Sequence, residues 1–178
     1  MHFTQFYSSP LFLNPAFAGA DVCSRVSLTY RNQWPGIYTT YKSYLLSIDH
    51  FIQSKNIGVG LLFANDIAGS GGLRTTLVNP MIAYQAKINK QLVMRLALQP
   101  GIGMRSINFN NLLFGDAIAH GTTVEQPTQT KTFFDLGAGA LFYTAKYWGG
   151  CEQQTFRIPG DGRNHWFAHR TTVEFAYT

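Results

Sequence analysis

Residues 92–105 read Leu-Val-Met-Arg-Leu-Ala-Leu-Gln-Pro-Gly-Ile-Gly-Met-Arg. Apolar side chains recur there at alternate positions, namely Leu92, Met94, Leu96, Leu98, Ile102 and Met104. The other alternate positions carry Arg95, Gln99, Gly101, Gly103 and Arg105. An alternation of period two predicts a β-strand with one apolar and one polar face. Such a strand can cross a bilayer when tilted, since about 9 to 11 residues suffice.

The same alternation recurs along the chain and predicts about eight strands in all. The other seven are expected at about 22–31, 40–51, 57–64, 73–87, 133–143, 147–155 and 165–178. Pro80 lies inside one of them, and we expect a β-bulge there because proline lacks the amide donor of a central strand. The connections are expected to alternate between long and short, with long loops at residues 65–72 and 106–132.

Composition supports a membrane wall rather than an ordinary soluble domain. Charged residues make up 13% of the chain and aromatic residues 15%, with 17 glycines, whereas soluble domains carry about 25% charged residues. No run of about 18 apolar residues is present, so a helical membrane span is excluded. A sheet that is apolar on one face only satisfies both observations.

We therefore predict an all-β fold, an antiparallel up-and-down transmembrane β-barrel in one domain, residues 1–178, whose strands occupy 21–178. Eight strands can close a small barrel or form part of a larger wall. The alternating loop lengths are typical of outer-membrane barrels, and so are aromatic residues near strand ends, such as Trp34 and Trp148. A soluble sandwich or lipocalin-like barrel is the alternative, but it would carry more outward charge.

The first twenty residues differ from the rest. They contain Phe3-Thr4-Gln5-Phe6-Tyr7 and then an apolar run from Leu11 to Gly19. Pro10 and Pro15 disfavour a helix and push Ser9 and Asn14 toward extended backbone. We expect residues 1–20 to form a kinked, extended strap that covers an apolar surface.

Cysteine content and charge exclude several classes of protein. Cys23 and Cys151 have neither the spacing of metal ligands nor the density of a disulfide scaffold. We interpret them as packing residues, with a disulfide between them as the less favoured alternative. The net charge of +5 is spread singly along the chain, which does not support nucleic-acid binding. The chain opens without a signal-peptide pattern, so any signal has been removed or omitted.

The sequence offers no strong catalytic or metal site. His165 and His169 with Arg170 and Glu174 could suggest a lipid-modifying enzyme, but no nucleophile, base and acid can be assembled from the spacing. Asp116 with His120 offers two metal ligands at most, and Asp66 with the following glycines lacks a calcium-loop pattern. We expect no catalysis, no metal and no cofactor.

Charged side chains on the polar face are expected to point into the barrel. They are Arg25, Arg95, Arg105, Asp49 and Asp135, together with Arg31 and Lys87. Pairing of the arginines with Asp49, Asp135 and Glu174 is the favoured interpretation, because charged interiors are ordinary in barrels. Binding of an incoming acidic segment is the other.

The opening residues carry a resemblance to a known family. Phe3-Thr4-Gln5-Phe6-Tyr7, then Pro10 to Gly19 with its Asn-Pro-Ala-Phe-Ala-Gly core, then Tyr30-Arg31-Asn32-Gln33-Trp34, resemble the N-terminal signature of the PorP/SprF family of Bacteroidetes. Asn79-Pro80, Gly137-Ala138-Gly139 and Tyr147-Trp148-Gly149-Gly150 are similar to the family as well. Family members are usually longer and have more strands.

The resemblance implies a multi-pass outer-membrane β-barrel of the type IX secretion system, without catalytic residues. Its expected partners are secreted cargo proteins or surface adhesins, including those of gliding motility, periplasmic secretion-ring lipoproteins, and outer-membrane lipid. A small porin-like channel or a lipid-modifying barrel is the alternative. The candidate partner-binding residues are Phe3, Phe6, Tyr7, Phe12, Asn14, Phe17 and Trp34.

Overall fold

A computed structural model of the chain describes residues 9–21, 23–34, 36, 41–69, 72–89, 91–107, 129–144, 147–157 and 166–177. For residues 129, 154–157 and 166–177 it describes the backbone alone. The elements are α1 (Pro10–Leu13), η2 (Pro15–Phe17), β1 (Arg25–Gln33), β2 (Tyr41–Ile52), β3 (Ile57–Ala68), β4 (Leu73–Lys87), β5 (Val93–Ile107), β6 (Gln129–Tyr143), β7 (Tyr147–Arg157) and β8 (Trp166–Tyr177).

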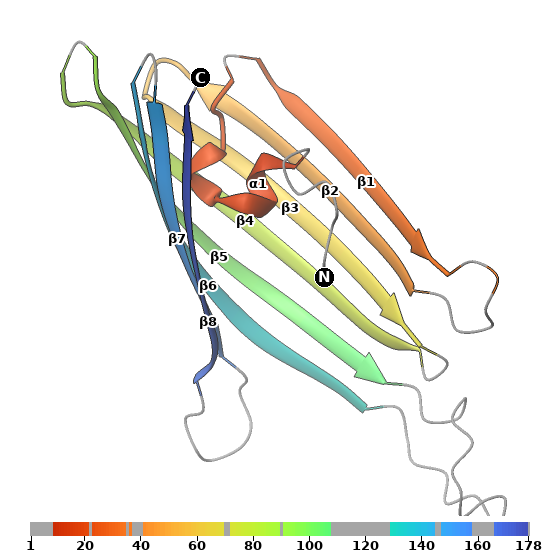
Figure 1. Cartoon of the computed structure of the whole chain (residues 1–178). Coiled ribbons are helices and arrows are strands. Elements are labelled where there is room, and N and C mark those ends of the chain that lie inside the picture. The colour runs from red at the N-terminus through yellow and green to blue at the C-terminus, as the bar shows by residue number, and fades with distance from the viewer. Residues whose placement is uncertain are drawn as a thin grey trace, which may run out of the picture.

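The eight strands form one antiparallel sheet in the order of the sequence, β1 to β8. Figure 1 shows the sheet curling into a half-barrel, with the N-terminal helical turns against its concave side. No pairing joins β1 to β8 within the strands that the structure describes. The predicted all-β, up-and-down arrangement is confirmed.

The loop predicted at residues 65–72 is wrong, because β3 continues to Ala68. The polar side chains of Asn65 and Asp66 form hydrogen bonds with the neighbouring strands, so they do not end β3. The Asn65 amide donates to Thr76 Oγ1 at 2.7 Å, and the Ser43 hydroxyl donates to the Asp66 carboxylate. The connection between β3 and β4 is therefore only residues 69–72.

Proline leaves the register intact, which corrects the predicted bulge at Pro80. Val78 pairs with Ile102, and Ile82 pairs with Leu98, so the offset between β4 and β5 is the same on either side of Pro80. In that register Pro80 stands opposite Pro100. Each lacks an amide donor, so the ladder lapses at this level without a shift.

The convex face of the sheet is apolar and exposed. On β1, Val26 is 65% exposed and Leu28 73% exposed. The same face of the later strands carries Leu61, Phe63, Val78, Ile82, Leu96, Leu98, Ile102, Phe134 and Leu136, all exposed. Because a soluble barrel turns its apolar face inward, this arrangement is that of a wall facing lipid.

The described part of the N-terminal segment, residues 9–20, contains two helical turns where an extended strap was predicted. Residues 10–13 form one α-helical turn, and residues 15–17 form a 3-10 turn. Pro10 and Pro15 each begin a turn, where the missing amide donor costs no hydrogen bond and the fixed φ suits a helix. Between the two turns, Asn14 has extended backbone, with φ −154° and ψ 128°. We call residues 9–20 the plug.

The core lies between the plug and the concave face. Leu11, Ala16 and Ala18 are fully buried against strand side chains. Those strand residues are Leu45, Leu62, Ala64, Met81, Ala83, Ala97 and Leu141. The expectation of a wall apolar on one face only is therefore wrong where the plug sits, because both faces are apolar there.

Within the described residues, no helix is long and apolar enough to cross a membrane. Cys23 and Cys151 are both free and exposed. Neither is a buried packing residue, and the alternative of a disulfide between them is not realised.

Candidate functional site

The plug is fixed from within by Asn14. Its side-chain oxygen accepts a hydrogen bond from the Ala16 amide at 2.9 Å, which caps the 3-10 turn. Its side-chain nitrogen donates to the Cys151 carbonyl of β7 at 3.2 Å. Asn14 is 1% exposed, and a buried amide needs such partners on both ends. One side chain therefore shapes the plug and ties it to the sheet.

Glycines on the concave side of β3 let the plug backbone approach the sheet. A β-carbon on Gly58 would collide with the Ala18 carbonyl group. A β-carbon on Gly60 would lie 2.8 Å from Leu11 Cδ2. The two glycines form a seat for the plug.

A second pair of glycines receives the middle of the plug. A β-carbon on Gly139 of β6 would collide with the Asn14 side chain and lie 2.9 Å from Pro15 Cγ. A β-carbon on Gly150 of β7 would lie 3.2 Å from Asn14 Nδ2. Asn14 therefore fits closely against Gly139 and Gly150, and a larger side chain at either glycine would displace the plug.

The end of the plug is held by a carboxylate. The Gly19 amide donates to Asp49 Oδ2 at 2.9 Å, and Arg25 Nε donates to Asp49 Oδ1 at 3.0 Å. Arg25 Nη2 also reaches the Phe17 carbonyl at 3.5 Å. Gly19 has φ +66°, a backbone conformation that favours glycine. Asp49 is 2% exposed, so its charge is balanced by Arg25 rather than by water.

Arg95 of β5 holds the neighbouring carbonyl. Its Nη2 donates to the Ala18 oxygen, and its guanidinium carbon lies 5.6 Å from the centre of the Phe51 ring. Arg95 is 1% exposed. The peptide group between Ala18 and Gly19 is therefore bound at both ends. Its oxygen accepts a hydrogen bond from the Arg95 guanidinium, and its nitrogen donates one to the Asp49 carboxylate.

An aromatic pair closes the far side of the plug. The rings of Phe17 and Trp148 meet edge to face, with centroids 5.6 Å apart. Trp148 lies at the start of β7, next to the turn that joins it to β6. Edge-to-face contacts of this kind add to the free energy gained by burial.

The plug lies toward one end of the half-barrel, where the short connections 53–56, 88–92 and 144–146 gather (Figure 1). Its contacts are with apolar surface, with the Cys151 carbonyl and with the charged side chains of Asp49, Arg25 and Arg95, which suits binding and occlusion. Within the described residues, no group of three or more His, Cys, Asp or Glu side chains is arranged to hold a metal.

Three of the proposed partner-binding residues, Phe12, Asn14 and Phe17, come together in the plug. Trp34 lies apart from them, past the opposite end of β1, where it is 54% exposed and packs edge to face on Tyr41 with centroids 5.7 Å apart. Phe3, Phe6 and Tyr7 lie outside the described residues, as do the loop residues Asp116, His120 and His165. The side chains of His169, Arg170 and Glu174 are likewise not described.

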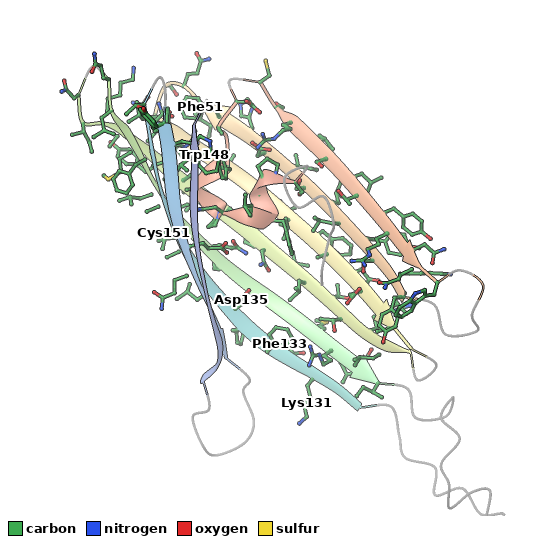
Figure 2. The ribbon with its side chains drawn as sticks, viewed as in Figure 1. Phe51, Lys131, Phe133, Asp135, Trp148 and Cys151 are labelled. Carbon is green, nitrogen blue, oxygen red and sulfur yellow. The ribbon has the colours of Figure 1, made fainter. Side chains whose placement is uncertain are left out.

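The charges expected inside the barrel occupy different environments. Asp49, Arg95 and Asp135 are buried on the concave side, and Figure 2 shows Asp135 and Phe133 along β6 beyond the plug. Arg25 is half-buried and paired with Asp49, as in the favoured interpretation. Arg105 is exposed near the end of β5.

The residues that receive the plug are not among those predicted as a site from the sequence. Gly58, Gly60 and Gly139 stand at inward positions of their strands, so the alternation already marked them as positions without a side chain. The carbonyl of Cys151 left no signal, since any residue supplies one. These residues form one site only because the plug contacts all of them, and tertiary packing determines where the plug lies.

No curated protein and no solved structure is significantly similar to the chain. The family described as type IX secretion system membrane protein PorP/SprF matches residues 1–160. That match spans the plug and most of the sheet, and the chain is a member of the PorP/SprF family of type IX secretion system membrane proteins.

Proposed function

We propose that the protein is an outer-membrane docking component of type IX secretion, which retains secreted cargo or adhesins at the cell surface and contacts the periplasmic machinery. It acts by binding, without catalysis. The observation that carries this proposal is the plug, which occupies the concave side of the sheet. A barrel filled by its own chain is suited to holding a partner rather than to conducting solutes.

The two ends of the half-barrel suggest two partners. The short connections and the plug lie at one end, and short turns in outer-membrane barrels face the periplasm. Residues 108–128 form the longest connection and join β5 to β6 at the other end. In this orientation that connection meets cargo outside the cell, while the plug end meets periplasmic lipoproteins of the secretion ring.

A flux assay in liposomes tests the proposal against a porin-like channel. The intact protein is expected to pass little of a small sugar, and deletion of residues 1–18 should raise the flux. Co-purification from cells should recover secreted surface proteins with the intact protein. High flux through the intact protein, with no co-purified surface protein, would favour the porin-like alternative.

The orientation has its own test. A protease site placed between residues 108 and 128 should be cut on intact cells, whereas a site in the turn at residues 53–56 should be cut only after the outer membrane is opened. The reverse pattern would invert the topology while leaving the docking role open to the co-purification assay.

A further inference from the structure

Charged side chains of the concave face also gather far from the plug. A row of inward positions crosses β1 to β6 near the end of the half-barrel that adjoins connection 108–128, which we call the long-loop end. Register joins these positions from strand to strand, and in order they are Arg31, Ser43, Asp66, Thr75, Arg105 and Lys131. The row therefore carries more positive than negative charge.

Two cations of this row stand directly opposite each other. Arg105 of β5 and Lys131 of β6 are register partners, and both side chains are exposed. Because side chains alternate along a strand, Lys131 shares the concave face with Phe133 and Asp135, which follow it along β6 (Figure 2). Side chains at opposite positions begin about 4.5 to 5.5 Å apart, and like charges there destabilise a sheet.

No acidic side chain offsets this repulsion within the part of the chain that the structure describes. The ion pairs found there belong to Arg25, at the plug end of β1. Asp66 is two strands from Arg105, about 9.5 Å away between strand axes, and it accepts a hydrogen bond from Ser43 on its other side. The two positive charges are therefore open to an outside anion.

An apolar floor lies beside the pair, on the side toward the plug. Gly103 of β5 stands opposite Phe133 of β6 in the next inward row. A β-carbon on Gly103 would collide with the Phe133 ring, so the ring lies across the glycine. Phe133 is buried. An apolar surface next to charged groups excludes water, which strengthens their attraction for an anion.

We propose, on the basis of the proposed docking function, that Arg105 and Lys131 bind carboxylates of an acidic peptide segment that enters the half-barrel at its long-loop end. The guanidinium can donate two parallel hydrogen bonds to one carboxylate, and the lysine adds a point charge. Arg31 lies in the same row on β1, and cations spread along a row suit a chain with several carboxylates better than one small ion. Lipid meets the convex face, away from this pair.

The experiment uses the full chain in neutral detergent. The probe is a rhodamine-labelled hexaglutamate peptide, and hexaglutamine with the same label is its control. Fluorescence anisotropy at low ionic strength should show that the wild type binds hexaglutamate in preference, and salt should weaken this binding because it screens exposed charges. Arg105→Gln with Lys131→Gln should lower the affinity for hexaglutamate by about tenfold, as expected for the loss of two exposed ion pairs.

Lys55→Gln with Lys87→Gln is the matched control. It removes the same two positive charges from exposed side chains at the end of the short connections, and it should bind as the wild type does. An equal loss in both double variants would overturn the proposal, because net charge alone would explain it. Displacement of the probe by inorganic phosphate at the probe's own concentration would overturn it in favour of a small-anion site. Heat-modifiable gel mobility shows that each variant is folded.

Co-purification from cells separates this site from the docking function itself. Surface proteins that co-purify equally with the wild type and with the Arg105 and Lys131 double variant would leave docking in place and overturn the role of this pair. Binding of hexaglutamate by the pair, without any co-purified surface protein, would support the carboxylate site and overturn the docking function.

Discussion

The Asp49 carboxylate and the Gly19 amide are joined at 2.9 Å, thirty residues apart in sequence, at the point where the chain leaves the plug for the wall. Asp49 belongs to β2, and the same carboxylate holds Arg25 of β1. The first two strands of the wall and the exit of the plug therefore share one buried anion. Removal of the Asp49 carboxylate should therefore destabilise both the plug and β1.

Asp49→Asn tests this sharing. It keeps an acceptor for the Gly19 amide but removes the charge that balances Arg25. The free energy of unfolding is expected to fall by about 1 to 3 kcal/mol, because hydrogen bonds of charged groups are lost at a buried site. Urea unfolding in detergent measures it. Asp21→Asn is the control and should cost less than about 1 kcal/mol, since an exposed ion pair contributes little.

Gly58→Ala should dislodge the plug. The new methyl group would meet the Ala18 carbonyl group, and overpacking of this kind costs about 1 to 3 kcal/mol. Protease sensitivity of residues 9–20 in the folded protein should rise. Gly36→Ala, with nothing within 4 Å of the added carbon, should behave as wild type. A protected plug in the Gly58 variant would show that the seat tolerates a side chain.

Asn14→Ser separates the two bonds of Asn14. Serine keeps an oxygen that can cap the Ala16 amide, but it cannot reach Cys151, whereas Asn14→Ala loses both bonds. We expect a smaller loss of stability for serine than for alanine, with the alanine variant losing about 1 kcal/mol more, as is typical of a lost cap. Equal losses would mean that the bond to β7 alone matters.

Phe17→Ala should be visible in the fluorescence of Trp148. Removal of the ring that packs on Trp148 at 5.6 Å lets water or detergent reach the indole, so the emission should shift to longer wavelength. A protein with Trp34 and Trp166 replaced by phenylalanine isolates the signal. The matching protein that retains only Trp34 should show no shift, because Trp34 packs on Tyr41 instead.

The strands were predictable where alternation was clean. β4 was predicted at 73–87 and is found at Leu73–Lys87, because period two survives even across Pro80. β3 was predicted too short because residues 65–72 are rich in Gly and Ser and suggested a loop, while in the sheet the side chains of Asn65 and Asp66 bond across strands. Local composition cannot show whether a polar residue has a cross-strand partner.

The plug was only half predictable. Its need for an apolar surface followed from Leu11 and Phe17, and the structure provides that surface. Its conformation did not follow, because a proline that breaks a helix from within is favoured at the first position of one. A wall apolar on one face only also leaves no role for Leu45 and Leu62, which are buried on the inward side against the plug.

The bond between Asn14 and the Cys151 carbonyl spans 137 residues of chain. Contacts that close such long loops form late in folding, since the entropy of closure is lost before the contact forms. Asn14 cannot meet its acceptor until β7 has joined β6, although it precedes every strand of the wall in the sequence. The plug can therefore take its final position only after the wall has been assembled as far as β7.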